Sequence, residues 1–213
     1  MVKQERAART RDALIRSAAE IFDREGFTAA SLTTISSQAG VSNGALHFHF
    51  PSKGSLADAV ESAAANQLQT ITDAEAFNGK SRLQHLVDVT HVLTTGLRED
   101  VVLRAGFELS GDTSRASHVD LRACWQAWVQ EAVGDADDQG ELCTGVSESA
   151  VTALVAATVG FEVLGSRDST WLSQPRVTQF WRLLLPRLAT AGLLDDLEAA
   201  GSRTPSEDQA VFF

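Results

Sequence analysis

The polar side chains best suited to binding lie close together, between residues 43 and 53. The amide of Asn43 carries the donor and the acceptor that match the N6 and N7 atoms of an adenine base. His47 and Lys53 carry donors that suit phosphate oxygens, and phosphate contacts position a protein on nucleic acid without reading its sequence. The residue types therefore indicate a nucleic-acid contact rather than a catalytic centre.

Other chemistry is not expected from this chain. His47 and His49 would point about 200° apart on a helix, so they do not form a shared metal site. The acidic run that starts at Asp135 begins like a calcium loop, but its twelfth position is Val146 instead of a bidentate Glu, and we expect a solvated loop. The sequence contains no nucleophile elbow, P-loop or Cys–His metal spacing. We expect no enzyme activity, no metal and no cofactor.

A pair of short helices is needed to present Asn43 and His47. The residues before Gly40 have the apolar spacing of one short helix, and Ser42 is a candidate N-cap for a second helix over about residues 43–49. Gly40 permits the sharp turn between them, because glycine adopts backbone conformations that other residues avoid. Two short helices joined in this way form a helix-turn-helix, whose second helix can enter the DNA major groove. The apolar residues expected to hold this unit together are Leu46, Phe48 and Phe50.

The remaining segments also show helical spacing. Apolar residues between Arg6 and Glu25 recur every three or four positions, and Gly26 predicts the end of that helix. Ser52 is a candidate cap for a long helix that reaches about residue 74. Further helices are expected near residues 81–97, 101–110, 117–133, 147–165 and 175–192. No window shows the two-residue alternation of a strand, so the predicted fold class is all-α, with a small N-terminal three-helix domain and a larger helical body.

The charge is distributed unevenly along the chain. The formal net charge of -10 does not by itself suit a nucleic-acid binder. Residues 1–55, however, carry seven Lys or Arg against five acidic residues, whereas residues 56–213 carry 11 basic and 23 acidic residues. We therefore predict a DNA-binding domain over residues 1–55, an acidic helical domain over residues 56–200 and a disordered polar tail over residues 201–213.

The sequence predicts a cytoplasmic protein without membrane association. No apolar stretch of a signal peptide follows Met1. The longest apolar run, residues 150–161, is shorter than the ~20 residues that cross a bilayer. Cys124 and Cys143 form no disulfide framework, which fits a reducing compartment.

Residues 31–56, SLTTISSQAGVSNGALHFHFPSKGSL, resemble the signature of TetR-family repressors, in which AGVS-x-G-x-L-Y-x-H-F-x-x-K marks the recognition helix. The resemblance implies a homodimer whose N-terminal domain binds double-stranded operator DNA and whose helical C-terminal domain binds a small hydrophobic effector. His47 replaces the usual Tyr, and Asn43 replaces a frequent Lys or Arg, so the operator preference of relatives is not expected to transfer. The residues expected to contact DNA are Arg6, Arg9, Thr33, Ser42, Asn43, Gly44, His47, His49 and Lys53.

A second resemblance concerns the C-terminal domain. The segment VVLRAGF at residues 101–107 and the opening KQERAARTRDALIRSAAEIFDREGF are similar to the γ-butyrolactone autoregulator receptors of streptomycetes, a group within the TetR family. In that group a Trp on the following helix lies over the lactone; Trp128 best matches it, with Trp125 next. A polar residue on the long fourth helix often faces the ligand, and Ala64 at that place predicts a wider, more apolar pocket. The other residues expected at the pocket are Phe107, Thr158, Phe161 and Glu162.

The resemblance also implies a four-helix dimer interface, formed by the last two long helices and their symmetry mates. Its expected residues are Ala150, Leu154, Val177, Trp181, Leu184 and Leu188. The expected function is repression of secondary-metabolism genes, relieved when the effector lowers DNA affinity. Two alternatives remain open: a pseudo-receptor that responds to an antibiotic or a biosynthetic intermediate, and a DNA-binding protein that responds to no ligand. A transcriptional activator with the same fold would have the same sequence features.

Overall fold

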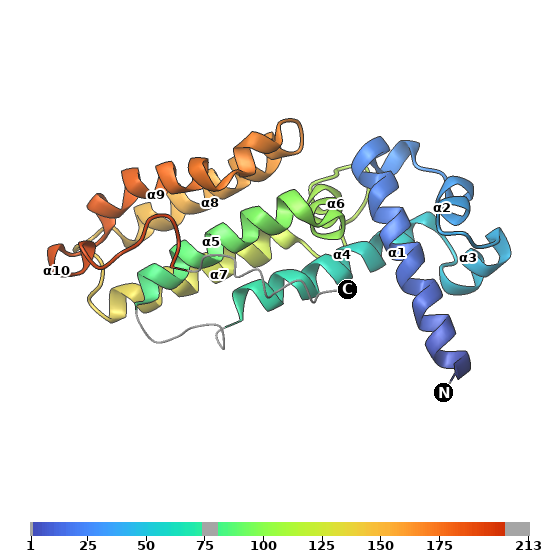
Figure 1. Cartoon of the computed structure of the whole chain (residues 1–213), viewed down its shortest axis with the longest axis horizontal. Coiled ribbons are helices and arrows are strands. Elements are labelled where there is room, and N and C mark those ends of the chain that lie inside the picture. Colours follow the sequence, from blue (N-terminus) through green and yellow to red (C-terminus); the bar gives the residue numbers. More distant parts are fainter. Residues whose placement is uncertain (1, 74–80, 203–213) are drawn as a thin grey trace. The chain divides into compact units, whose positions relative to one another are not determined.

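The computed structural model describes residues 2–73 and 81–202. These residues form ten α-helices and one short 3-10 helix, without a strand among them, and the all-α prediction is confirmed (Figure 1). The elements in chain order are α1 (Val2–Ala29), α2 (Leu32–Gln38), α3 (Asn43–His49), α4 (Lys53–Thr72), α5 (Arg82–Glu99), α6 (Val101–Ser110), α7 (Leu121–Asp138), α8 (Ser147–Gly165), η2 (Ser169–Leu172), α9 (Gln174–Leu188) and α10 (Ala191–Leu194).

The chain forms two compact units. Among the described residues, the first unit contains residues 2–70 and 99–124, and the second contains residues 71–73, 81–98 and 125–202. The first unit therefore includes α6 in addition to the N-terminal helices. The predicted boundary at residue 55 stays a prediction about which part of the chain folds as a separate domain.

The first unit has one continuous apolar core, to which α1, α2, α3, α4 and α6 all contribute. α1 changes direction at Gly26, whose backbone angles of φ 77° and ψ 161° are not helical. Glycine tolerates such a positive φ without the steric cost of a Cβ atom, so the predicted helix end at Gly26 is confirmed as a break. Gly40 has φ 67° and makes the turn between α2 and α3. At the start of α4, Ser52 and Ser55 cap each other: Ser55 N donates to Ser52 Oγ at 3.0 Å and Ser52 N donates to Ser55 Oγ at 3.1 Å.

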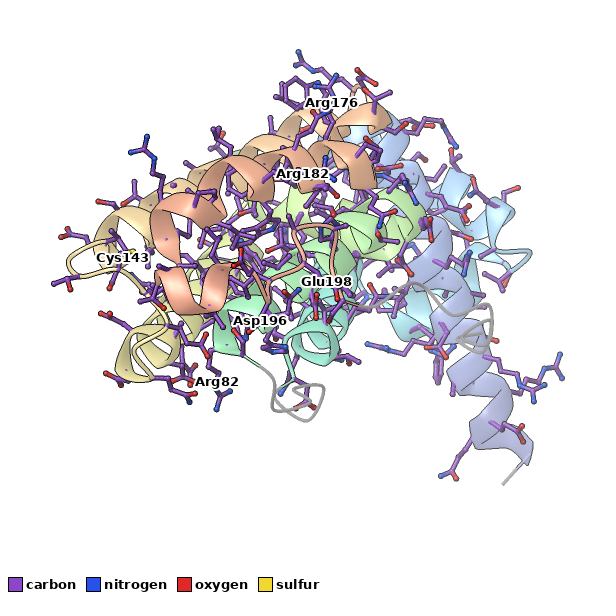
Figure 2. All side chains as sticks on the ribbon, turned by 60° about the vertical axis from the view of Figure 1, so that its left-hand side comes forward. Arg82, Cys143, Arg176, Arg182, Asp196 and Glu198 are labelled. Carbon is purple, nitrogen blue, oxygen red and sulfur yellow. The ribbon has the colours of Figure 1, made fainter. Side chains whose placement is uncertain are left out.

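In the second unit α8 lies beside α9, and α5 lies beside α7 (Figure 1). The segment after α10, which includes Asp196 and Glu198 (Figure 2), returns to α5: Glu198 N donates to Gln84 Oε1 at 2.7 Å. Ser202 N donates to Asp88 Oδ1 at 2.7 Å. Ser202 is therefore held in place, and the rest of the tail predicted to be disordered, residues 203–213, lies outside the described residues.

α7 differs from its predicted range of 117–133 at both ends. It begins at Leu121, where Asp120 Oδ1 accepts a hydrogen bond from Ala123 N at 2.9 Å. It continues through Gly134 to Asp138, and Gly140 with φ 69° follows its end. The acidic run from Asp135 is thus the last turn of a helix, and the prediction of a loop is wrong there.

Candidate functional site

α3 has one exposed and one buried face. Its exposed residues are Asn43, Gly44, His47 and Phe48. Residues four positions apart are neighbours on a helix surface, so Asn43 lies next to His47 and Gly44 next to Phe48. Leu46, on the opposite side, is fully buried in the core of the first unit. A short helix that is anchored by one face and open on the other has the arrangement of a recognition helix.

Phe48 does not hold the helix-turn-helix together. Its side chain is 83% exposed, whereas Leu46 and Phe50 are buried. Residues 46 and 50 lie one turn apart on the same face, and residue 48 lies two positions from each, on the other side of the helix. The prediction that all three residues pack in the core is wrong for Phe48, whose ring meets the half-buried His49 ring edge-on at 5.3 Å between centroids.

Asn43 is tied to α2. Ser36 Oγ donates to Asn43 Oδ1 at 2.7 Å, and Asn43 Nδ2 donates to Thr33 Oγ1 at 3.4 Å. Ser42 is also engaged, because its hydroxyl caps α3 by accepting from Ala45 N at 3.2 Å. Paired recognition of adenine uses both amide atoms of an asparagine, so a base contact by Asn43 competes with these internal hydrogen bonds. The DNA contacts of Thr33, Ser42 and Asn43 stay predictions.

Lys53 closes the end of α1. Its Nζ donates to the carbonyl oxygens of Phe27, Thr28 and Ala30 at 2.7, 3.0 and 3.0 Å, and it lies 4.7 Å from the centroid of the Phe27 ring. A lysine ammonium has three donors, and all three are used here. The side chain neutralises the carbonyls of a helix C-terminus, where a positive charge is favourable. A phosphate contact by Lys53 would compete with these hydrogen bonds and stays a prediction.

The exposed cations of the first unit lie on α1. Arg6 and Arg9 are exposed, and the Arg9–Glu5 pair at 2.7 Å is open to solvent on both sides, so it costs little to break. The guanidinium of Arg11 lies 5.3 Å from the centroid of the Phe50 ring at the end of the recognition helix. Sequence reasoning did not select Arg11, although its charge in the basic opening of the chain was a signal. DNA contacts by Arg6, Arg9, His47 and His49 stay predictions.

The 101–107 segment forms most of α6 and joins α6 to two other helices of the first unit. Arg104 makes a bidentate ion pair with Asp23 on α1, with Nε–Oδ1 and Nη2–Oδ2 distances of 2.7 and 2.9 Å. The hydrogen bond to Asp23 raises the pKa of Arg104 above its ordinary value. Gly106 lies against Ala64 on α4, since a Cβ atom at position 106 would stand 2.2 Å from the Cβ of Ala64.

Ala64 is thus a packing residue. It is fully buried, and its small side chain leaves room for the backbone of α6 at Gly106. The expectation that Ala64 widens an apolar ligand pocket is wrong, because the space beside it is filled by that helix.

A buried ion cluster joins α4 to the segment between α6 and α7. The Glu61 carboxylate is fully buried and accepts from Arg115 Nη1 at 2.5 Å, from Ser117 Oγ at 3.0 Å and from His118 N at 2.8 Å. Arg115, whose side chain is 7% exposed, also pairs with the Asp58 carboxylate. Sequence reasoning missed this cluster, and its only local signal was an acidic residue between the apolar residues of α4.

The second unit contains the two tryptophans expected at the effector site. Trp125 is buried, and its Nε1 donates to Thr158 Oγ1 at 2.7 Å. Trp128 is half-buried, stacks on Trp125 at 5.0 Å between centroids, and donates from Nε1 to the carbonyl oxygen of Thr72 at 3.2 Å. The structure therefore brings three predicted pocket residues together: Trp125 stacks on Trp128 and is hydrogen-bonded to Thr158.

The other predicted pocket residues, Phe107, Phe161 and Glu162, lie on α6 and α8. Phe161 and Glu162 are buried on α8, and the Phe161 ring meets Phe180 of α9 edge-on at 5.7 Å. Phe107 belongs to the first unit. A cavity of about 340 Å³ in the second unit is lined by Ser81, Gln84, Leu193, Asp196, Glu198 and Ser202, and one of about 630 Å³ is lined by Gln126, Gln130, Glu148, Val151, Thr152, Val155, Ala156 and Val159. Neither lining includes a predicted pocket residue, so the effector contacts stay predictions.

Most residues predicted for the dimer interface are buried inside the protomer. Ala150, Leu154, Val177, Trp181 and Leu188 are at most 4% exposed, and Leu184 is half-buried. These side chains therefore lie on the inner faces of α8 and α9, with little surface to offer a partner, and the predicted interface contacts stay predictions. The large apolar side chains that these two helices expose are Val163, Leu164 and Leu183.

α8 is also the one described helix long and apolar enough to cross a membrane by length and composition. Its mean hydropathy is 1.4, and 33% of its apolar window is buried. Apolar residues occur on both faces of this helix. A helix that packs in the core of a protein can have the same length and composition.

Known proteins match this chain in its N-terminal region and over most of its length. The sequence profile described as "Bacterial regulatory proteins, tetR family" matches residues 14–60. The A-factor receptor protein of Streptomyces griseus is 29% identical over 208 residues, which cover 94% of this chain and 71% of that protein.

Solved structures agree with this match. A γ-butyrolactone receptor described as an ArpA-like protein has 25% identity and a TM-score of 0.77, with 91% of this chain and 96% of that chain covered. CprB from Streptomyces coelicolor A3(2), a TetR-family protein, has 26% identity and a TM-score of 0.78, with 90% and 95% covered. CprB in complex with its operator sequence has 27% identity and a TM-score of 0.76, with 90% and 94% covered.

Proposed function

Since this chain is a TetR-family DNA-binding regulator related to the γ-butyrolactone receptors, we propose that it is a repressor that binds palindromic operator DNA as a homodimer. A small hydrophobic signal molecule, such as a γ-butyrolactone, releases it from the operator. The proposal rests chiefly on the exposed face of α3, a short helix that the core anchors through Leu46. A protein of this kind acts in the cytoplasm, where its operator lies.

The exposed apolar residues of α8 and α9 support a homodimer. Leu183 is 78% exposed, and Val163 and Leu164 are each more than 40% exposed. Two copies related by a twofold axis would bury these residues against one another. The two recognition helices would then enter successive major grooves about 34 Å apart, which is one turn of DNA.

Charge at the dimer surface gives a direct test. We expect Leu183→Glu to convert the protein from dimer to monomer in sedimentation velocity, because two carboxylates would be buried in the interface. Val92→Glu, which adds the same charge at an exposed residue of α5, is the matched control and should remain dimeric. A Leu183→Glu protein that stays dimeric would contradict this interface.

The stacked Trp125 and Trp128 support an effector of the γ-butyrolactone class. Stacked aromatic rings suit an alkyl-substituted ring. Both indole N–H groups already donate within the protein, to Thr158 and to Thr72, so a hydrogen bond to a ligand oxygen would require one of these bonds to be exchanged. The same surface also suits a larger aromatic antibiotic or biosynthetic intermediate, which is the pseudo-receptor alternative. A protein that responds to no ligand is the remaining alternative.

The whole proposal is tested by selecting duplexes from a random DNA pool and titrating the selected operator by fluorescence anisotropy. We expect a palindromic site, and we expect synthetic γ-butyrolactones to weaken binding by about 5- to 150-fold, the usual range of allosteric coupling. Trp128→Ala should abolish this response while leaving DNA affinity intact. Release only by polyaromatic antibiotics would favour the pseudo-receptor, and no release by either class would favour the ligand-independent protein.

A further inference from the structure

Phe48 is a large apolar side chain in an unusual place. It is the most exposed of the large apolar residues in the described part of the chain, at 83%. Its ring contact, edge-on to His49, leaves most of the ring in solvent. A single exposed apolar residue needs no explanation on an ordinary surface, but Phe48 lies on the exposed face of the helix that is proposed to enter the DNA groove.

Gly44, a neighbour of Phe48 on the exposed face of α3, leaves room for DNA to approach this helix. Gly44, one turn earlier on the same face, has no side chain, and a Cβ atom added there would meet only Ser42 Oγ at 3.8 Å. The helix backbone can therefore approach DNA closely at Gly44. The ring of Phe48, one turn further on, would then reach the edges of adjacent base pairs.

Two of the hydrogen-bonding side chains on this face, those of Asn43 and Ser42, are engaged inside the protein. The Asn43 carbonyl oxygen accepts from Ser36, and the Ser42 hydroxyl caps α3. The face thus offers an aromatic ring that lies mostly in solvent, beside two polar side chains that already have partners and the exposed His47. At position 48 itself the side chain has no hydrogen-bonding group, so any base contact it makes is apolar.

We propose that Phe48 determines operator specificity by packing against the 5-methyl group of thymine in the major groove. The inference rests on the proposed DNA-binding function. The thymine methyl is the one apolar group that a base pair presents in the major groove, and phenylalanine side chains are suited to contact it. Phe48 therefore distinguishes T·A from C·G pairs without donating or accepting a hydrogen bond.

The test uses the full-length protein and the operator selected from random duplexes. Each thymine of the half-site is replaced in turn by deoxyuridine, which removes only the methyl group, and affinities of the wild type and of Phe48→Ala are measured by fluorescence anisotropy. Loss of one buried methyl corresponds to about fourfold in affinity. Loss in both half-sites of a palindrome corresponds to about fifteenfold, if the two contacts are independent.

We expect one or two thymine positions at which deoxyuridine weakens the wild type by this factor and leaves Phe48→Ala unaffected. His47→Ala is the matched control, because it alters the adjacent exposed residue; it should weaken binding but keep the wild-type sensitivity to deoxyuridine. Because Phe48 is exposed, Phe48→Ala should retain the thermal stability of the wild type, which separates a lost contact from a lost fold.

Two results would overturn the assignment. If Phe48→Ala keeps the full sensitivity to deoxyuridine, or if no thymine position is sensitive in the wild type although the operator binds tightly, Phe48 does not read thymine and only this inference fails. If the wild-type protein selects no duplex at all, the proposed DNA-binding function fails together with it.

Discussion

Replacing the buried Glu61 carboxylate tests directly how much its ion pair with Arg115 contributes to the unfolding free energy. Glu61→Gln keeps the shape of the side chain and removes its charge. Removing one partner of a buried ion pair leaves the other charge uncompensated, which costs about 3–5 kcal/mol. Arg115 retains Asp58 as a partner, and the introduced amide oxygen can still accept from His118 N. We therefore expect a loss at the lower end of that range, about 3 kcal/mol of unfolding free energy.

Asp58→Asn is the matched control, because Asp58 pairs with the same guanidinium but its side chain is 44% exposed. Exposed ion pairs contribute about 0–1 kcal/mol. Both variants are to be measured by urea denaturation followed by far-UV circular dichroism. In a heat scan of a chain of this size, Glu61→Gln should lower Tm by about 6–12 °C and Asp58→Asn by less than about 4 °C.

A Glu61→Gln protein that stays within about 1 kcal/mol of the wild type, the range of an exposed pair, would contradict the stabilising role of this buried pair. An Asp58→Asn protein that loses as much stability as Glu61→Gln would equally contradict it, because burial then does not decide the strength of the pair. A double variant, Glu61→Leu with Arg115→Leu, separates charge from packing. It should recover part of the loss, since replacing a whole buried pair by apolar residues is often neutral or stabilising, but Ser117 Oγ and His118 N lose their acceptor.

Three further outcomes follow from other contacts. Lys53→Met should lower the unfolding free energy by about 2–3 kcal/mol in urea denaturation, because three carbonyls at the end of α1 lose a charged donor; an unchanged stability would contradict the capping role. Gly106→Ala should cost about 1–3 kcal/mol through overpacking against Ala64, and a second change, Ala64→Gly, should restore most of it. The Asp168 carboxyl should titrate below the ordinary aspartate pKa of about 3.9 in NMR, because hydrogen bonds from the side chain and backbone of Thr170 lower its pKa. Its contribution to stability is therefore present above the ordinary pKa and is lost as the pH falls through the lowered one, and Thr170→Ala should raise the titration midpoint.

The helix-turn-helix could be predicted because its signals are local. Gly40 at the turn and Ser42 at the cap act within a few residues of their own positions, so the sequence alone places α3 at residues 43–49. The regular helix spacing also located α6 and α8, with the same limits as in the structure.

The contacts that the sequence did not predict join residues far apart in the chain. The cap that Lys53 forms on α1 is one such contact, because only the fold brings the α1 carbonyls, more than 20 residues earlier, to its ammonium group. The start of α7 was placed too early because Ser117 and His118 bind Glu61 of α4 instead of continuing a helix. Helical periodicity also marked the inner faces of α8 and α9 as a dimer surface, since an apolar stripe does not reveal whether it packs within one chain or against another.

The contacts among α1, α4 and α6 limit how an effector can alter the recognition helix. α6 is joined to α1 by the Arg104–Asp23 ion pair and to α4 by the close contact of Gly106 with Ala64, while Lys53 at the start of α4 closes the end of α1. Three helices joined at three points cannot shift relative to one another unless at least one of these contacts changes. The coupling between an effector and DNA is typically about 1–3 kcal/mol, which is comparable to the loss of a single charged hydrogen bond. If an effector acts on this protein as proposed, rearrangement of one of these contacts, with the core of the first unit left intact, would supply a free-energy change of the size that release from the operator requires.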